Sequence, residues 1–209
     1  MKRTIINLII YIFLPSLLPL FFTNNINSKE YTLLMFITYM LLTIYFIFIN
    51  KKELKNNIKD FKFNKLKTTI NIFIIGIGLM LLSNYIINYL IIPNGISNNE
   101  LGNRNMLLNN KIIYSILLSL IIPFLEEIVF RLNFKKIIKN KYVYLFLTSI
   151  IFSLLHNISD TKIIELLYII PYFILGYTLG LIYYKTDNII YSLLAHIFNN
   201  TFVVILLLI

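Results

Sequence analysis

The chain has 209 residues, of which 58% are hydrophobic and only 13% are charged, and its formal net charge is +10. A soluble domain of this length has no use for so much apolar surface, so the composition excludes an ordinary globular protein and indicates an integral membrane protein. Cysteine is absent, which excludes disulfides, a thiolate nucleophile and a Cys-ligated metal.

The apolar runs are too long for strands, and about 20 residues of helix are needed to cross the hydrocarbon core of a bilayer. A helix also satisfies its backbone polar groups within its own segment. We therefore predict an all-α, polytopic membrane helical bundle of about seven transmembrane helices, built as a single integral membrane domain over residues 1–209. The predicted spans are 4–22, 31–50, 68–92, 112–132, 142–156, 166–184 and 188–209.

Loops rich in Lys and Arg alternate along the chain with loops that contain few of these residues. With seven spans and the N-terminus inside, all but four of the 19 Lys and Arg residues lie on the cytoplasmic side. The four exceptions are Lys29, Arg104, Lys111 and Lys162. The positive-inside rule thus predicts this orientation and accounts for the basic charge without a nucleic-acid partner. Residues 94–110 then form the longest outer loop, placed to cap the bundle or to contact partners.

The amino-acid composition indicates the kind of organism that the protein comes from. Ile, Asn and Lys are abundant, Ala195 is the only alanine and Trp is absent. We interpret this as the bias of a low-GC bacterium and expect a multi-pass protein of the cell membrane, with the lipid bilayer as its surroundings.

The fourth predicted span carries three ionisable residues, Glu126, Glu127 and Arg131. Ionisable groups are expensive in hydrocarbon and usually face a protected interior where they act in chemistry or transport. Glu127 and Arg131 are four residues apart and can pair on one helix face, whereas Glu126 lies about 100° around the axis. Arg131 then neutralises the carboxylate of Glu127, and the carboxylate of Glu126 stays available for chemistry. The competing interpretation is an interfacial Glu–Arg pair at a helix end.

The two histidines of the chain, His156 and His196, also lie in apolar spans. His196 and Asn200 are four residues apart, so their side chains project from one face of the last span. Taken singly, His156 could be a helix-end group, and His196 and Asn200 could be polar contacts between helices. Together with the acidic pair, these residues have the makings of a water-activating site, which we expect within the membrane and nearer its cytoplasmic side.

Three motifs on separate spans carry a resemblance to a known family. They are Glu-Glu-x-x-x-Arg at 126–131, Phe-x-x-x-His at 152–156 and His-x-x-x-Asn at 196–200. In this order they resemble the CPBP family, the CAAX proteases and bacteriocin-processing enzymes also called Abi or type II CAAX prenyl endopeptidases. The resemblance covers about residues 110–205 as a catalytic core, while 1–109 match only as three generic spans. Leu132 departs from the glycine that often follows the arginine in the family.

The resemblance implies an intramembrane endopeptidase that hydrolyses a membrane-associated peptide, for example in bacteriocin or signal-peptide processing or in self-immunity. We expect Glu126, with His156, to activate water, His196 and Asn200 to hydrogen-bond the oxyanion, and Glu127 and Arg131 to hold the helix.

Two alternatives stay open. One is a zinc metalloprotease, in which Glu126, His156 and His196 would be the ligands, although no local metal-binding spacing exists. The other is a non-enzymatic immunity or binding protein of the same fold. A small transporter fits less well, because no inverted repeat is visible.

Overall fold

The computed structural model describes residues 2–21, 27–93, 95–157 and 163–209. No β-strand occurs in these residues, so the predicted all-α class is confirmed. The elements are α1 (Lys2–Phe21), α2 (Ser28–Ile49), α3 (Lys51–Lys59), α4 (Asn64–Tyr85), η1 (Ile86–Ile91), α5 (Asn98–Asn109), α6 (Lys111–Ile116), η2 (Leu117–Ile121), α7 (Ile122–Glu127), η3 (Ile128–Asn133), α8 (Phe134–Ile137), α9 (Lys141–Leu155), η4 (Ile163–Tyr168), α10 (Ile169–Thr186) and α11 (Ile189–Leu208).

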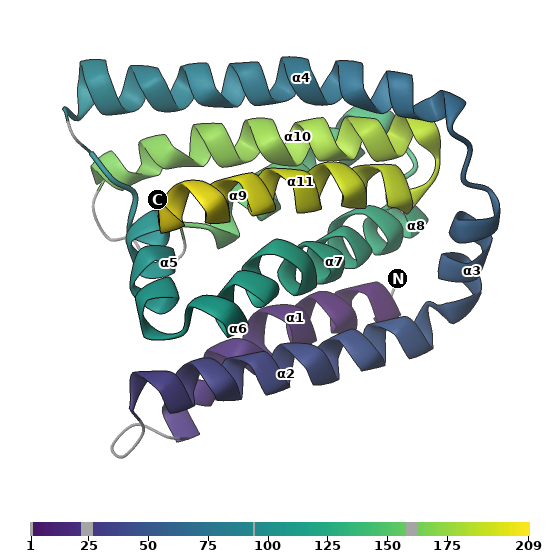
Figure 1. Ribbon diagram of the computed structural model, residues 1–209. Coiled ribbons are helices and arrows are strands. Elements are labelled where there is room, and N and C mark those ends of the chain that lie inside the picture. The colour runs from purple at the N-terminus through teal and green to yellow at the C-terminus, as the bar shows by residue number, and fades with distance from the viewer. Residues whose placement is uncertain (1, 22–26, 94, 158–162) are drawn as a thin grey trace.

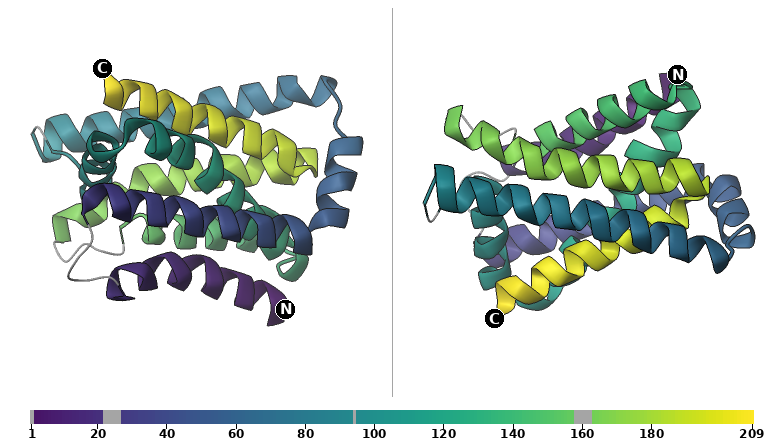
Figure 2. Two further views of the ribbon diagram at one scale, coloured as in Figure 1. Left: turned by 60° about the horizontal axis from the view of Figure 1, so that its bottom comes forward. Right: turned by 90° about the horizontal axis from the view of Figure 1, so that it is seen from above.

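The long helices run roughly along one axis, and two short helices lie across the ends of the bundle (Figure 1). The lysine-rich α3 lies at the end where the chain begins, and α5 lies at the opposite end. Helix α10 packs against α4, α9 and α11, while α1 and α2 pack on the side of the α6–α8 segment. Figure 2 shows the same arrangement from two further directions.

Each predicted span corresponds to a helix in the structure. Among the described residues, five helices are long and apolar enough to cross a membrane: 28–49, 64–91, 111–137, 165–186 and 189–208. The apolar stretch 5–15 in α1 and the helix α9 are shorter. The polytopic membrane bundle is therefore confirmed in class, and the count of seven spans stays a prediction.

Among the described residues, three π-helical turns occur within two of the predicted spans, and the sequence pattern does not predict them. η1 ends the α4 span, and η2 and η3 flank α7, the helix that carries the two glutamates. A π-turn inserts a residue into a helix and changes which face the subsequent side chains occupy. Pro123, which has no N–H group, is the second residue of α7 and follows η2 by two positions. The helix 111–137 therefore changes from α-helical to π-helical geometry on both sides of its two glutamates.

Two glycines let α10 approach α9 closely. A Cβ atom added at Gly176 would lie 3.1 Å from the Phe152 ring and 3.2 Å from the Ser149 Cα. The Ser149 Cα is a backbone atom, so it cannot move away without a shift of the helix α9. At Gly180 an added Cβ would lie 3.2 Å from Leu145 and 3.6 Å from Arg131 Nη1. Small residues commonly allow such close contacts between membrane helices.

The predicted outer loop 94–110 contains a helix. α5 begins at Asn98, after the Ser97 hydroxyl accepts a hydrogen bond from the Glu100 backbone N–H at 3.2 Å. An exposed Glu100–Arg104 pair at 2.6 Å supports it from one turn to the next. Helix α5 therefore lies across the end of the bundle (Figure 1).

Candidate active site

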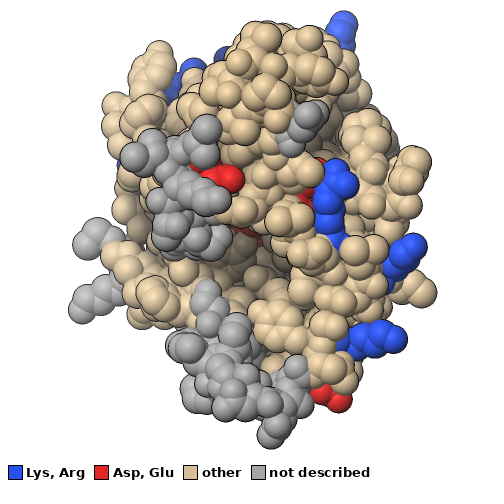
Figure 3. Space-filling model, turned by 90° about the vertical axis from the view of Figure 1, so that its left-hand side faces the viewer, with Lys and Arg blue, Asp and Glu red and all other residues tan. Residues whose placement is uncertain are grey.

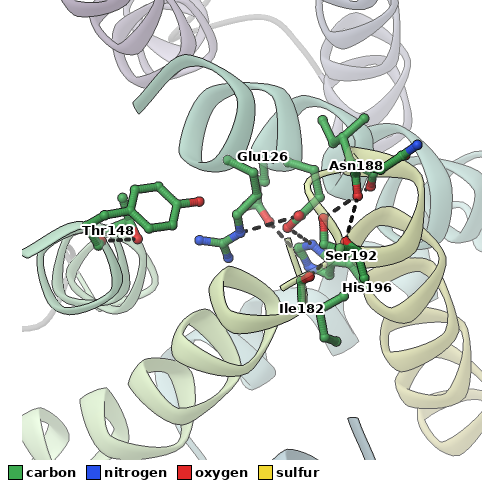
Figure 4. Close-up of polar contacts among 11 residues, drawn as sticks. Glu126, Thr148, Ile182, Asn188, Ser192 and His196 are labelled. Carbon is green, nitrogen blue, oxygen red and sulfur yellow. Dashed lines mark hydrogen bonds and ion pairs between the residues drawn. The ribbon is translucent and has the colours of Figure 1, made fainter. Parts of the chain in front are cut away.

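The two glutamates and His196 form the polar centre of the bundle (Figure 4). Glu126 and Glu127 end α7 and are 5% and 0% exposed, and His196 of α11 is 1% exposed. The His196 Nδ1 atom lies 3.1 Å from Glu127 Oε1, and its Nε2 atom lies 3.5 Å from Glu126 Oε2. Both ring nitrogens thus face carboxylates, although Glu126 and Glu127 leave their helix in different directions.

Arg131 neutralises one of the two acids. Its Nε atom lies 3.3 Å from Glu127 Oε2 within the same helical segment, and the side chain is fully buried. The guanidinium lies over the Phe152 ring at 5.8 Å, in the space that Gly180 leaves open. The predicted Glu127–Arg131 pair is therefore present. A buried charge needs such a partner, because an isolated one would be very costly in this environment.

The two ring nitrogens of His196 contact different carboxylates. A carboxylate accepts but does not donate, so the contact with Glu127 places a proton on Nδ1. Glu127, itself held by Arg131, thereby fixes the ring with Nε2 toward Glu126. An oriented imidazole beside a carboxylate is an arrangement that can move a proton at a defined atom.

Tyr11 of α1 is a further member of the site that the sequence interpretation missed. Its hydroxyl donates a hydrogen bond to Glu126 Oε1 at 2.8 Å. The two oxygens of Glu126 therefore have different partners, Tyr11 on one and His196 on the other. No pattern around Tyr11 signals this role, because the first span is uniformly apolar around it.

His156 lies beside this centre rather than in its hydrogen-bond network. It is the C-cap of α9, and its Nδ1 atom lies 2.7 Å from the Phe152 carbonyl oxygen. Because a carbonyl only accepts, Nδ1 carries the proton and Nε2 is left for other partners. The ring stacks on Tyr172 at 4.4 Å between centroids. The acid Glu126 is thus paired with His196, whereas the sequence interpretation paired it with His156.

The Asn200 side chain supplies a backbone hydrogen bond that the helix around Pro123 lacks. The Ile122 N–H bonds to the Leu117 carbonyl in the π-turn, and the next residue, Pro123, has no N–H to offer. The Leu118 carbonyl is thereby left without either of these helical donors, and Asn200 Nδ2 donates to it at 3.0 Å. Asn199 donates to Asn200 Oδ1 at 3.1 Å, which fixes the amide orientation. One N–H of Asn200 is used here, and the second has no partner among the described hydrogen bonds.

These side chains line one cavity of about 660 Å³. It contains Tyr11, Glu126, His156, His196 and Asn200, and it continues to residues of α5 at the end of the bundle. Figure 3 views the molecule from that end and shows the surface hollowed between the helices. A cavity of this size suits a small ligand or a short stretch of peptide.

The three residues expected as zinc ligands do not form a three-ligand group. Within the described ranges, no group of three His, Asp or Glu side chains is arranged so that it could hold a metal ion. Glu126 and His196 are neighbours, while His156 has its Nδ1 atom on its own helix. The folded chain therefore brings two of the three expected ligands together and leaves the third apart.

The structure brings all six predicted residues to one region of the bundle. Glu126, Glu127, Arg131 and His196 are linked directly by charged contacts. His156 and Asn200 share the cavity with Glu126 without a direct contact to it among the described hydrogen bonds and ion pairs.

Comparison with known proteins gives the same family as the motifs. The model of the type II CAAX prenyl endopeptidase Rce1-like family matches residues 108–202. The UPF0177 protein YxdF of Lactococcus lactis subsp. lactis (strain IL1403) is 27% identical over 169 residues, which cover 79% of this chain and 90% of that protein. No solved structure shows a significant match. Residues 108–202 of this helical membrane protein are therefore similar to the Rce1-like type II CAAX prenyl endopeptidases, the family that the three motifs resemble.

Proposed function

We propose that the chain is an intramembrane endopeptidase in which Glu126 activates a water molecule for attack on a peptide bond. The observation that carries the proposal is the buried contact of His196 with both Glu126 and Glu127, at 3.5 and 3.1 Å, on the wall of a cavity. The match to an endopeptidase family supports the same reaction class.

The attack begins with the cavity water. Its oxygen adds to the scissile carbonyl carbon while one of its protons passes to Glu126. A positioned carboxylate base of this kind contributes a factor of about 10² to 10⁴ in rate. Tyr11 and His196 hold the carboxylate from its two oxygens, so Glu126 is set in one orientation before the substrate arrives. His156, whose Nε2 atom has no helical partner, is placed to hold the water.

The negative charge that develops on the carbonyl oxygen needs donors. The free N–H of Asn200 and the Nε2 side of His196 are the candidates, since both residues line the cavity. When the C–N bond breaks, the proton held by Glu126 passes to the departing nitrogen, which leaves a carboxylate and an amine. Glu127 and Arg131 touch neither the water nor the peptide in this scheme and keep His196 in place.

We further propose a membrane-associated peptide as the substrate, with bacteriocin or signal-peptide processing and self-immunity as the candidate settings. The family name refers to prenylated CAAX proteins. The bacterial source inferred from composition leads us to expect an unprenylated peptide instead.

The test is cleavage of candidate peptides in proteoliposomes by the wild type and the Glu126→Gln variant. Glutamine keeps the shape of the side chain but cannot take the proton, so cleavage should fall by at least about 10²-fold. Asp60→Asn is the matched control, because Asp60 is an exposed acid that caps α3 far from the cavity. Equal cleavage by Glu126→Gln and wild type would leave the non-enzymatic binding protein as the better interpretation.

The same assay separates the zinc alternative. If Glu126, His156 and His196 hold a catalytic zinc ion, a chelator abolishes cleavage and added zinc restores it. Activation of water by Glu126 without a metal predicts that cleavage survives the chelator.

A further inference from the structure

We infer that the cavity receives its substrate from the non-cytoplasmic side of the membrane, as an extended peptide segment. This inference rests on the proposed function for the reaction. It rests on three separate features of the structure for the direction of access: the position of the cavity mouth, the closure of the opposite end and the polar lining between them.

The mouth lies at the α5 end of the bundle. From His196 the cavity continues along α11 past Val203 to Leu207, and its outer wall includes Glu100 and Arg104 of α5. In Figure 1, α5 and the C-terminal end of α11 lie together, opposite α3. The same end faces the viewer in Figure 3, where the hollow is visible.

That end is the one predicted to face outward. Only four of the 19 basic residues belong to the loops predicted to face outward, and the three of them that the structure describes lie in α2 (Lys29), α5 (Arg104) and α6 (Lys111). Basic residues are retained on the cytoplasmic side of membrane proteins, so the α3 end is cytoplasmic and the α5 end is not. His196 is the eighth residue of α11, about 10 Å from its cytoplasmic end. The acid–imidazole centre is therefore nearer the cytoplasm in depth, while the opening is on the far side.

The cytoplasmic end beneath His196 is closed by hydrogen bonds between α3, the α3–α4 connection and the α10–α11 turn. Asn57 accepts from the Ile189 N–H at 2.7 Å through its side chain and from Asn188 Nδ2 at 2.6 Å through its backbone carbonyl. The Tyr191 hydroxyl accepts from the Lys62 N–H at 2.6 Å and donates to the Lys62 carbonyl at 2.7 Å.

Two ion pairs close the same end further out. Lys135 pairs with Asp187, and Lys136 pairs with Glu53 at 2.8 Å. A substrate coming from the cytoplasm would have to break several of these contacts, whereas the cavity formed by the described residues continues to the α5 end.

The lining between mouth and centre suits a peptide backbone. Neutral amides and phenols face one another in pairs: Tyr168 with Asn88 at 2.8 Å, Asn99 with Tyr172 at 2.6 Å and Tyr114 with Asn103 at 2.7 Å. All six residues line the cavity. Each group has hydrogen-bonding capacity beyond its pair, and such groups match the N–H and C=O groups of an extended chain. An apolar lipid chain would leave this capacity unsatisfied.

The absence of cysteine from the chain gives a clean test by single-cysteine labelling. Val203→Cys and Leu207→Cys place a thiol in the cavity, Asn105→Cys reports the exposed surface of α5, and Lys55→Cys reports the exposed surface of α3. Intact cells are treated with a small, membrane-impermeant thiosulfonate reagent, and a second sample is permeabilised first.

We expect Asn105→Cys, Val203→Cys and Leu207→Cys to react in intact cells, and Lys55→Cys to react only after permeabilisation. The inference is overturned if both cavity thiols react only after permeabilisation or do not react at all. It is also overturned if Lys55→Cys reacts in intact cells while Asn105→Cys is protected, because the orientation would then be reversed. These readouts need no catalysis, so they stand whether or not a peptide is cleaved.

A second measurement tests whether the peptide substrate reaches the catalytic centre through this cavity. Labelling Val203→Cys with a bulky group should reduce peptide cleavage at least 10-fold, while the same label on Asn105→Cys should leave it unchanged. Full cleavage by labelled Val203→Cys overturns the assignment of this cavity as the substrate path. Absence of cleavage by the unlabelled wild type would instead count against the proposed function and leave the labelling result standing.

Discussion

The Tyr11 hydroxyl donates a hydrogen bond to Glu126 across 115 residues of sequence, at 2.8 Å. Tyr11 belongs to α1, which precedes the segment 108–202 that matches the family model. The first helix therefore contributes a side chain to the candidate base and is more than a membrane anchor. It packs against α2 and the π-turn η3, which places it beside the end of α7.

Removing this donor should weaken catalysis without unfolding the protein. A hydrogen bond to a charged group contributes about 1.5 to 3 kcal/mol, so Tyr11→Phe should lower the cleavage rate by roughly 10- to 100-fold. The matched control is Tyr177→Phe, a tyrosine of α10 that does not line the cavity. Single-turnover cleavage in proteoliposomes measures both. An unchanged rate in Tyr11→Phe would show that His196 alone is enough to orient Glu126.

Two Glu–Arg pairs with the same helical spacing occur among the described residues, one buried and one exposed, and their contributions to stability should differ. Arg131→Ala leaves the charge of Glu127 buried, and breaking such a pair typically costs about 3 to 5 kcal/mol of folding free energy. Arg104→Ala breaks an exposed pair, for which about 1 kcal/mol or less is expected after solvent screening. Thermal unfolding in detergent, followed by circular dichroism, compares the two. Similar losses in both variants would contradict the assignment of Arg131 as the neutralising partner.

The contact between Asn200 and the Leu118 carbonyl predicts a rescue. Asn200→Ala leaves that carbonyl unpaired and should cost about 1 to 3 kcal/mol of stability. Pro123→Ala restores an N–H group five residues after Leu118, which is the donor that a π-turn would use. The double variant should therefore recover stability relative to Asn200→Ala.

Cleavage should not recover in that double variant, because the oxyanion donor proposed for Asn200 is still missing. A double-mutant cycle in unfolding free energy measures the coupling, and independent, additive losses would argue against the missing helical bond. Recovery of both stability and cleavage would indicate that Asn200 acts only through the backbone.

Gly176 should tolerate no side chain, because its neighbour on one side is backbone. Gly176→Ala would bring a Cβ to 3.2 Å from the Ser149 Cα, and such overpacking typically costs about 1 to 3 kcal/mol. Gly78→Ala is the matched control, since Gly78 lies in a helix with open space around the new Cβ and alanine is the better helix former by about 1 kcal/mol. The first variant should lower the unfolding temperature and the second should maintain or raise it. A harmless Gly176→Ala would mean that α9 and α10 can separate at little cost.

The membrane class, the helical architecture and most residues of the candidate site, Tyr11 excepted, could be predicted from the order of amino acids alone. Long apolar runs leave few structures open to the backbone, and ionisable residues inside them are so rare that Glu126, Glu127, Arg131, His156 and His196 stand out. The Glu127–Arg131 pair was also predictable, because a four-residue spacing fixes it within one helix.

The partners of those residues depend on how the helices pack in three dimensions. The π-turns η2 and η3 insert residues into the helix around Glu126, and one inserted residue rotates the rest of the helix by about 100°. Contacts between helices depend on that rotation and on how closely the glycines of α10 let it approach its neighbours, and neither is encoded in local spacing. The pairing of Glu126 with His196, the donation from Tyr11 and the extension of the cavity to α5 therefore became visible only in the folded chain.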